Sequence, residues 1–232
     1  MMVNCEQDSV LNFLPAPKIL PNKKGVRAKG DKRRYIQVLS SFDIETTRIT
    51  TIDNSVMYIW QWSFYDLETN EFIRTIYGRT WGEYVGTCLE IKQWISQVQS
   101  EEPVFMVRLV HNLSYEFQFI SAFVEYPPES VFAIKKRKIA RADSYNCIED
   151  RCTYIHSNMS LDKYAETWNA EHQKLSGIEF DYSKPRWAWT ELTEKELAYC
   201  EHDVLSVIEA YVNEMRHFND TLYTVPLQRL VM

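Results

Sequence analysis

Four acidic side chains stand in three short motifs whose residue types and spacing could hold a pair of divalent cations. Asp43 and Glu45 belong to FDIETT, Glu116 to HNLSYEF, and Asp203 to YCEHD, in which Tyr199 precedes it by four residues. Two cations about 3.5–4 Å apart, clamping the attacking and leaving oxygens of a phosphodiester, need a cluster of carboxylates of this kind. The chemistry indicated is therefore cleavage at phosphorus, with two Mg²⁺ or Mn²⁺ ions as the expected cofactors.

The spacing of these side chains predicts which of them share a surface. Asp43 and Glu45 are two residues apart at the end of a predicted strand, so both carboxylates point to the same face of the sheet. Tyr199 and Asp203 are four residues apart on a predicted helix, which places them on one side, a turn apart. Glu116 falls at the start of a helix, where the macrodipole favours an acid. The motifs can meet only if the first strand neighbours the fourth, and we expect this adjacency.

Hydrophobic patterning along the chain predicts a mixed α/β fold. β-branched and aromatic runs predict three successive antiparallel strands and, after a helix, a fourth strand. Capping boxes predict the starts of two helices. The predicted elements are strands 35–43, 56–65, 71–77 and 104–110, short strands within 131–156, and helices 80–98, 113–126, 160–169 and from 193 onward. This order is compatible with an RNase H-like domain, in which helices flank a mixed five-stranded sheet.

The amino-acid composition is typical of a globular protein. The 232 residues are 45% hydrophobic and 25% charged, which is ordinary for one globular domain with its own core. No apolar run approaches the ~18–20 residues of a membrane span, and the N-terminus lacks the pattern of a secretory signal. Five cysteines without a Cys-x-x-Cys pair favour reduced thiols. We therefore expect a soluble, cytoplasmic protein that has no membrane partner and no small-molecule cofactor.

Positive charge is concentrated in two stretches, although the net charge is −6. Residues 18–34 hold eight Lys and Arg against Asp31 alone. The second stretch, in mid-chain, comprises Lys135, Lys136, Arg137, Lys138 and Arg141. Such stretches could bind a nucleic-acid backbone, or they could be a solvated tail and a solvated hairpin. Residues 1–34 lack a hydrophobic period, so we expect a flexible basic arm before a domain spanning residues 35–217 and a C-terminal tail over 218–232.

The three motifs resemble those of a known family. DIETT, VHNLSYEFQFI and YCEHDV are similar to the exonuclease motifs of the protein-primed family B DNA polymerases of bacteriophages and linear plasmids, in the tyrosine branch of the DEDD superfamily. NMSLDKYAE and KLSGIEFDYSKPR also resemble that group, so the resemblance covers roughly residues 36–227. It implies an RNase H-like proofreading domain that removes mispaired nucleotides from a single-stranded DNA 3′ end, in a phage-infected or plasmid-bearing bacterium.

The resemblance also implies a role for each motif residue. Asp43, Glu45 and Asp203 would bind the metals directly. Glu116 would serve the second metal, and Tyr199 would position the attacking water. The positions that match contacts to the 3′-terminal nucleotides are Thr46, Asn112 and Tyr115, and the position that matches an auxiliary catalytic lysine is Lys174. A stacking ring and an amide beside the metals would grip a terminal base without reading sequence, although Tyr115 could instead pack under its helix.

The sequence departs from the family in two respects. Many members carry Asp where this chain has Glu116, a longer side chain that still ligates hard cations. The polymerase motifs of the family are absent from these residues, so we expect no polymerisation by this chain. TLYTVPLQRLVM starts like the family's link into the polymerase half. The chain could be the exonuclease part of a longer or split polymerase, with a polymerase half or a priming protein as partner, or a free-standing nuclease.

Other functions remain open from the sequence alone. Cys147, Cys152, His156 and His172 could be grouped as a zinc site, but the two cysteines are five residues apart and would face opposite sides of a strand. We expect His202 to point away from Asp203. An RNase H-like module that binds single-stranded DNA or a priming protein without cleaving it is the alternative function. RNA is an alternative substrate, because nothing in the motifs reports on the 2′-hydroxyl.

Overall fold

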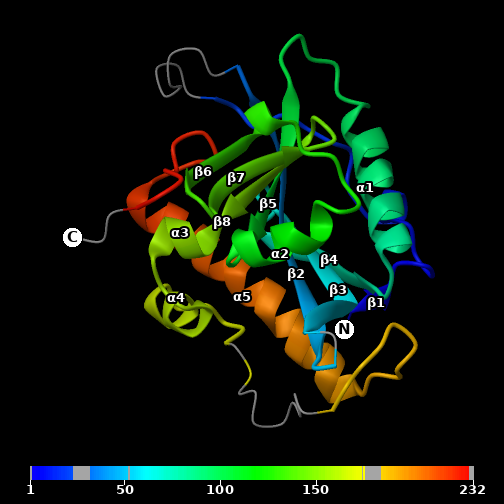
Figure 1. The fold of residues 1–232 in the computed structure, drawn as a ribbon. Helices are drawn as coiled ribbons and strands as arrows, with labels where there is room; N and C mark the ends of the chain where they lie inside the picture. Colours follow the sequence, from blue (N-terminus) through cyan, green and yellow to red (C-terminus); the bar gives the residue numbers. More distant parts are fainter. Residues whose placement is uncertain (1, 23–31, 52, 174, 176–183, 230–232) are drawn as a thin grey trace.

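A mixed eight-stranded sheet forms the centre of the fold, with strands in the spatial order β1-β4-β3-β2-β5-β8-β7-β6 (Figure 1). The structure, a computed structural model, describes residues 2–22, 32–51, 53–173, 175 and 184–229. The strands are β1 (Val3–Asn4), β2 (Arg34–Ile49), β3 (Asn54–Asp66), β4 (Glu71–Gly78), β5 (Val104–Val110), β6 (Val131–Lys135), β7 (Lys138–Ser144) and β8 (Ile148–Cys152). The helices are α1 (Trp81–Ile95), α2 (Leu113–Ile120), α3 (Thr153–Ser157), α4 (Leu161–Thr167) and α5 (Glu194–Phe218), with short 3-10 turns at Val10–Asn12 and Pro128–Ser130. The predicted α/β class is confirmed, in a mixed sheet of eight strands rather than the predicted five.

Strand alternation divides the core into two layers. Phe42 of β2 and Met106 of β5 point to one face, where α1 covers them. Leu39 of β2 and Val107 of β5 point to the other face, where α5 packs against them through residues such as Ile208. Asp43 and Glu45 share the odd-numbered register of Leu39, so the sheet presents their carboxylates to the α5 side. The central strands are therefore covered on both faces.

Parallel pairing of β2 with β5 brings the first two motifs together. Leu39, Ser40 and Ser41 pair with Val107, Arg108 and Leu109. This pairing is the predicted adjacency of the first and fourth strands. The three predicted antiparallel strands are also found, since β2 pairs with β3 and β3 with β4 in antiparallel register.

The N-terminal segment packs onto the domain, contrary to the expectation of a flexible arm. Val3 and Asn4 form β1, which pairs in parallel with β4. Val10 and Leu14 are buried in the core that α1 covers, and the indole of Trp94 donates a hydrogen bond to the carbonyl of Pro15 at 2.8 Å. The folded region thus begins well before residue 35. Most of the basic stretch, residues 23–31, lies outside the described residues.

Several element boundaries also differ from the predictions. β2 continues to Ile49, so Asp43 and Glu45 lie inside this strand rather than at its end. The helix predicted over 113–126 ends at Ile120, and residues 153–157 form a helix instead of a strand. Leu222 and Val225 are buried against the core on the α5 side, so the described part of the C-terminal tail belongs to the same fold. No helix in the described residues combines the length and apolarity needed to cross a membrane.

A buried ion pair joins two central strands. Arg108 of β5 and Asp150 of β8 are paired in register and fully buried, with Nε to Oδ1 at 2.5 Å and Nη2 to Oδ2 at 3.0 Å. The guanidinium of Arg108 also lies over the rings of Trp62 and Phe42, at 4.5 and 4.8 Å from their centroids. Arginine can be buried in this way because a bidentate carboxylate and aromatic faces replace its hydration.

Replacing Asp150 by alanine should destabilise the protein strongly, because it leaves the buried charge of Arg108 without its partner. We expect a loss of about 3–5 kcal/mol in the free energy of unfolding, measured by urea denaturation. The matched control is Glu166→Ala, which breaks the exposed pair between Lys163 and Glu166 and should have no measurable effect. Equal stabilities of Asp150→Ala and the parent protein would contradict this role.

Candidate metal centre

Three carboxylates from two distant parts of the chain converge on the α5 side of the sheet. Asp43 and Glu45 come from β2 and Asp203 from α5, and one oxygen from each lies within 4.8 Å of the others. In the described part of the chain this is the one group of His, Cys, Asp and Glu side chains close enough to hold a metal ion. The predicted sharing of a metal by the first and third motifs is therefore geometrically possible.

The carboxylate of Glu116 lies beside this group and is almost completely buried. Glu116 is in the first turn of α2 and is 3% exposed, and its Oε2 has no hydrogen-bond partner among the described residues. Burial raises its pKa well above the ordinary 4.5, and the negative charge of Asp43 raises it further. A buried carboxylate oxygen that lacks a donor is the arrangement that a cation would stabilise.

One cleft of about 290 Å³ brings together all five predicted catalytic side chains that the structure describes (Asp43, Glu45, Glu116, Tyr199, Asp203). Asn112 and Tyr115 also line it, as do His111, Leu161 and Val207. Tyr199, Asp203 and Val207 are four residues apart in succession, so they form one line along α5 that faces the cleft.

The second motif closes one side of the cleft. Asn112 precedes α2 with a left-handed backbone, at a φ of 72°. Tyr115 is half-buried, and its hydroxyl forms a 2.6 Å hydrogen bond with the hydroxyl of Thr46. This bond joins α2 to β2 across the cleft wall. Tyr115 therefore reaches the first motif through its hydroxyl while its ring lines the cleft, and Thr46 contacts the cleft through Tyr115.

Two features of the site were not predicted from the sequence. Gln61 of β3 pairs with Asp43 in antiparallel register, and its Nε2 donates a 2.9 Å hydrogen bond to Oδ2 of Asp43. The alternation of β3 could have placed Gln61 on this face, but only the strand register identifies its partner. Cys200, next to Tyr199, is buried, and burial followed by the charges of Glu45 and Asp43 raises the pKa of its thiol.

The remaining candidates lie elsewhere or outside the described residues. Lys174 is outside them, so its predicted role stays a prediction. The ring of His202 points away from the cleft, where its Nδ1 is 3.0 Å from the carbonyl of Gln173. His111 lines the cleft and bonds to Thr153 at 3.0 Å.

The zinc grouping is not assembled in the described chain. His156 bonds to Glu214, at 2.9 Å, and to the carbonyl of Pro226, while His172 bonds to Glu209 at 2.7 Å. Cys147 and Cys152 are both buried, the first just before β8 and the second at its last residue. These contacts leave the acidic group in the cleft as the candidate metal centre.

The donor set in the cleft fits hard divalent cations. Its possible ligands are carboxylate oxygens, which suit Mg²⁺ and Mn²⁺, whereas the neighbouring thiol of Cys200 is buried and its pKa is raised. Asp43, Glu45 and Asp203 could share one ion, and Glu116 beside Asp43 extends the set toward a second.

Comparison with known structures gives the same architecture. Phi29 DNA polymerase complexed with single-stranded DNA matches with a TM-score of 0.59 and 16% identity, over 80% of this chain and 33% of the polymerase chain. Phi29 DNA polymerase complexed with primer-template DNA and incoming nucleotide matches with a TM-score of 0.58 and 16% identity, over 80% and 32% of the two chains. No family model and no curated protein matches.

The chain shares its fold with phi29 DNA polymerase. That enzyme is a protein-primed family B polymerase, so the resemblance read from the three motifs is confirmed as a structural similarity. A match at this identity shows a shared fold, which is the RNase H-like α/β fold expected from the sequence. This chain spans about a third of the length of the polymerase chains that it matches.

Glu116 should make the metal-free protein less stable as pH rises. Because its pKa is raised on folding, the folded protein holds a proton there more tightly than the unfolded chain, and stability is lost from the ordinary pKa of 4.5 upward. We expect the melting temperature in EDTA to fall more between about pH 5 and about pH 8 for the parent than for Glu116→Gln. Parallel pH curves for the two proteins would contradict the buried, repelled state of Glu116.

Proposed function

We propose that this protein is a metal-dependent 3′→5′ exonuclease that acts on single-stranded DNA ends. The observation that carries the proposal is the meeting of four carboxylates and a tyrosine, from three distant motifs, in one cleft. The shared fold with a DNA polymerase that has been seen in complex with single-stranded DNA supports the choice of substrate. Within a longer or split polymerase of the protein-primed type, this activity would serve proofreading.

Each side chain has a distinct task in the proposed reaction. Asp43, Glu45 and Asp203 would hold the cations, and Glu116 would complete the second site. Bound cations would supply Lewis-acid polarisation of the phosphate and a lowered pKa for the attacking water. Tyr199, which lines the cleft one helical turn from Asp203, would orient this water through its hydroxyl.

Hydrogen bonds from neighbouring groups hold two side chains of the site in position in the absence of a substrate. The amide of Gln61 fixes the orientation of Asp43, and the hydrogen bond between Thr46 and Tyr115 fixes the ring that lines the cleft. Hydrolysis of the terminal phosphodiester would release a nucleoside 5′-monophosphate and leave a strand shortened by one nucleotide. The 3′-oxygen of the shortened strand leaves with a proton from water.

The activity can be tested with a 5′-labelled single strand and Mg²⁺ or Mn²⁺. The parent should produce a ladder of shortened products, Asp43→Ala should produce none, and Tyr199→Phe should be slower by about 10²–10⁴-fold, the usual contribution of one positioned catalytic group. The rate should rise with pH until the attacking water is deprotonated. Binding without products in the parent would favour a non-catalytic module, and equal cleavage of RNA would widen the substrate class.

Tyr115 should contribute to binding by stacking on a terminal base. Tyr115→Phe removes the hydroxyl bonded to Thr46 but keeps the ring, whereas Tyr115→Ala removes both. We expect the alanine variant to lose about 1–3 kcal/mol in the free energy of binding single-stranded DNA, and the phenylalanine variant much less. Fluorescence anisotropy measures both affinities. An unchanged affinity in Tyr115→Ala would exclude the stacking role.

A further inference from the structure

The β6–β7 hairpin carries an isolated concentration of positive charge. Residues 131–142 hold five cations and no acid, in a protein whose net charge is −6. Lys136 and Arg137 form the turn, between the paired residues Lys135 and Lys138. β6 is the last strand of the sheet, and its residues from Phe132 to Lys135 are exposed. The hairpin therefore presents its charge to solvent.

Four of these cations lack acidic partners, whereas Arg141 lies 3.9 Å from Asp143 and some exposed cations elsewhere are paired. Lys18 pairs with Glu68 at 2.6 Å, and Lys163 pairs with Glu166 at 2.9 Å. By contrast, no described residue forms an ion pair with any member of the run Lys135, Lys136, Arg137 and Lys138. Four adjacent cations without internal neutralisation repel one another, and an external polyanion would relieve this repulsion.

The backbone of the turn adds a separate observation. Arg137 has a φ of 61°, in the left-handed region where glycine or asparagine is favoured. A long charged side chain at this position costs conformational energy that a glycine would avoid. Charges on an edge strand can guard against strand pairing with another molecule, but Arg137 lies in the turn, beyond the paired residues. A binding role for positive charge at the tip would explain both why an arginine has this backbone conformation and why it lies beyond the paired residues.

The hairpin adjoins the candidate active site through β7, which packs against α2 and α3. The backbone N–H of Ile139, in β7, donates to the hydroxyl of Ser114 at 2.9 Å, and Ser114 precedes Tyr115 in the cleft wall. The ring of Tyr154 packs edge-on against His111, which also lines the cleft, and Tyr154 is 38% exposed.

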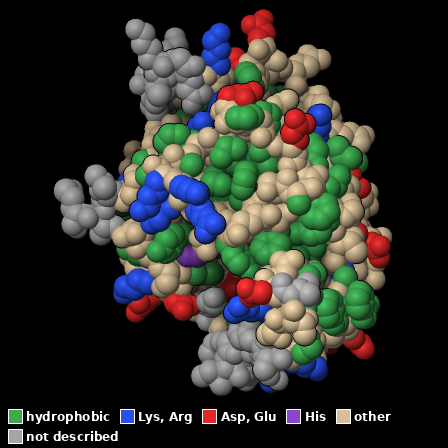
Figure 2. Space-filling model, viewed as in Figure 1, with side chains coloured by type: hydrophobic (Ala, Val, Ile, Leu, Met, Phe, Trp, Pro, Cys, Tyr) green, Lys and Arg blue, Asp and Glu red, His purple; other side chains and the backbone are tan. Residues whose placement is uncertain are grey.

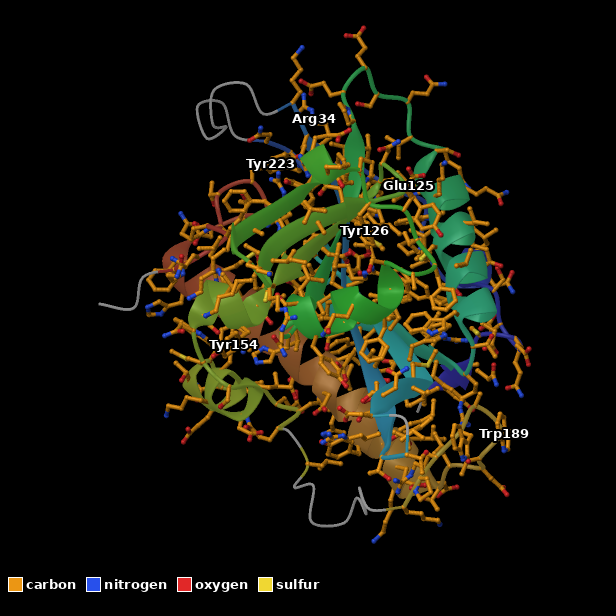
Figure 3. All side chains as sticks on the ribbon, in the orientation of Figure 1. Arg34, Glu125, Tyr126, Tyr154, Trp189 and Tyr223 are labelled. Atoms are coloured by element: carbon orange, nitrogen blue, oxygen red, sulfur yellow. The ribbon has the colours of Figure 1, made fainter. Side chains whose placement is uncertain are left out.

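β6, β7 and α3 lie on one face of the molecule (Figure 1). Figure 2 shows Lys and Arg side chains gathered on the face that carries β6, β7 and α3. Figure 3 shows Tyr154 on α3 on this same face, whereas Trp189 projects from the opposite side of the view. Exposed apolar side chains accompany the charge, since Phe132 and Ile134 of β6 are 49% and 47% exposed. A groove or surface that combines cations with exposed rings suits a single strand, whose bases stack and whose phosphates are charged.

We propose that the β6–β7 turn binds the phosphates of the upstream part of a single DNA strand whose 3′ end lies in the cleft. This inference rests on the proposed nuclease function and names the second contact region for the same substrate. The strand would run from the cations of the turn past Tyr154 to the carboxylates of the cleft. Lys136 and Arg137 would act as binding residues only, since they do not reach the reacting atoms.

The test uses the double variant Lys136→Ala/Arg137→Gly, in which glycine suits the left-handed backbone and folding should be preserved. The control, Lys18→Ala/Lys92→Ala, removes two cations from the segment beside the start of β2 and from α1. Binding is measured in the Asp43→Ala background by anisotropy, with a labelled strand of about 15 nucleotides, long enough to pass from one region to the other. Two lost phosphate contacts should lower affinity about tenfold at about 0.1 M salt and reduce the slope of log K against log salt by about 1.4.

Kinetics separate this inference from the proposed function. With an active site intact, the hairpin variant should show a raised KM and an unchanged kcat on the long strand, and the parental rate on a strand of about three nucleotides. If neither protein degrades DNA, the proposed function fails, while the binding comparison still reports on the hairpin. If the parent degrades DNA and the hairpin variant binds the long strand with the affinity and salt slope of the control, the hairpin inference is overturned.

Discussion

The parallel pairing of β2 with β5 brings together three of the four carboxylates of the cleft, and α5 supplies the fourth, Asp203. β2 supplies Asp43 and Glu45, and the chain leaves β5 directly into the turn and helix that carry Glu116. Burial, and after it the negative charge of Asp43, raises the pKa of Glu116, so this group of carboxylates is costly to hold in its charged form. The carboxylates stay close together because they are attached to a central strand and a 25-residue helix. Both elements are stabilised by apolar contacts in the two layers of the core.

The cleft is acidic and the β6–β7 turn is basic, and this difference in charge predicts the order in which a strand would bind and be cleaved. Acidic groups are concentrated in the cleft, where cations would convert a repulsive surface into an attractive one for phosphate. The β6–β7 turn is attractive without any ion, because its cations have no acidic partners among the described residues. A strand could thus be captured by the turn first and committed to cleavage only after the metal sites fill, since capture and cleavage depend on different charges.

Local patterning predicted the elements whose faces are buried, and it failed where the decisive contacts are long-range. The β3, β5 and α5 segments have strong periodicity, so their positions agree with the prediction. Burial of the N-terminal segment depends on single residues such as Val10 and Leu14, which produce no period. β2 extends past Asp43 because polar residues there pair with β3. The carboxylates were predictable from type and spacing, but the bond from Gln61 to Asp43 depends on strand register alone.

The buried thiol of Cys200 lies near the carboxylates without being one of the possible metal ligands. This cysteine adjoins Tyr199 at the edge of the carboxylate group, and its raised pKa keeps the sulfur protonated. Thiophilic ions such as cadmium need a thiolate, so the centre offers them only oxygen and gives them no advantage over magnesium. A buried, protonated thiol is a poor nucleophile, so Cys200 should resist alkylation and oxidation although it lies beside a polar cleft.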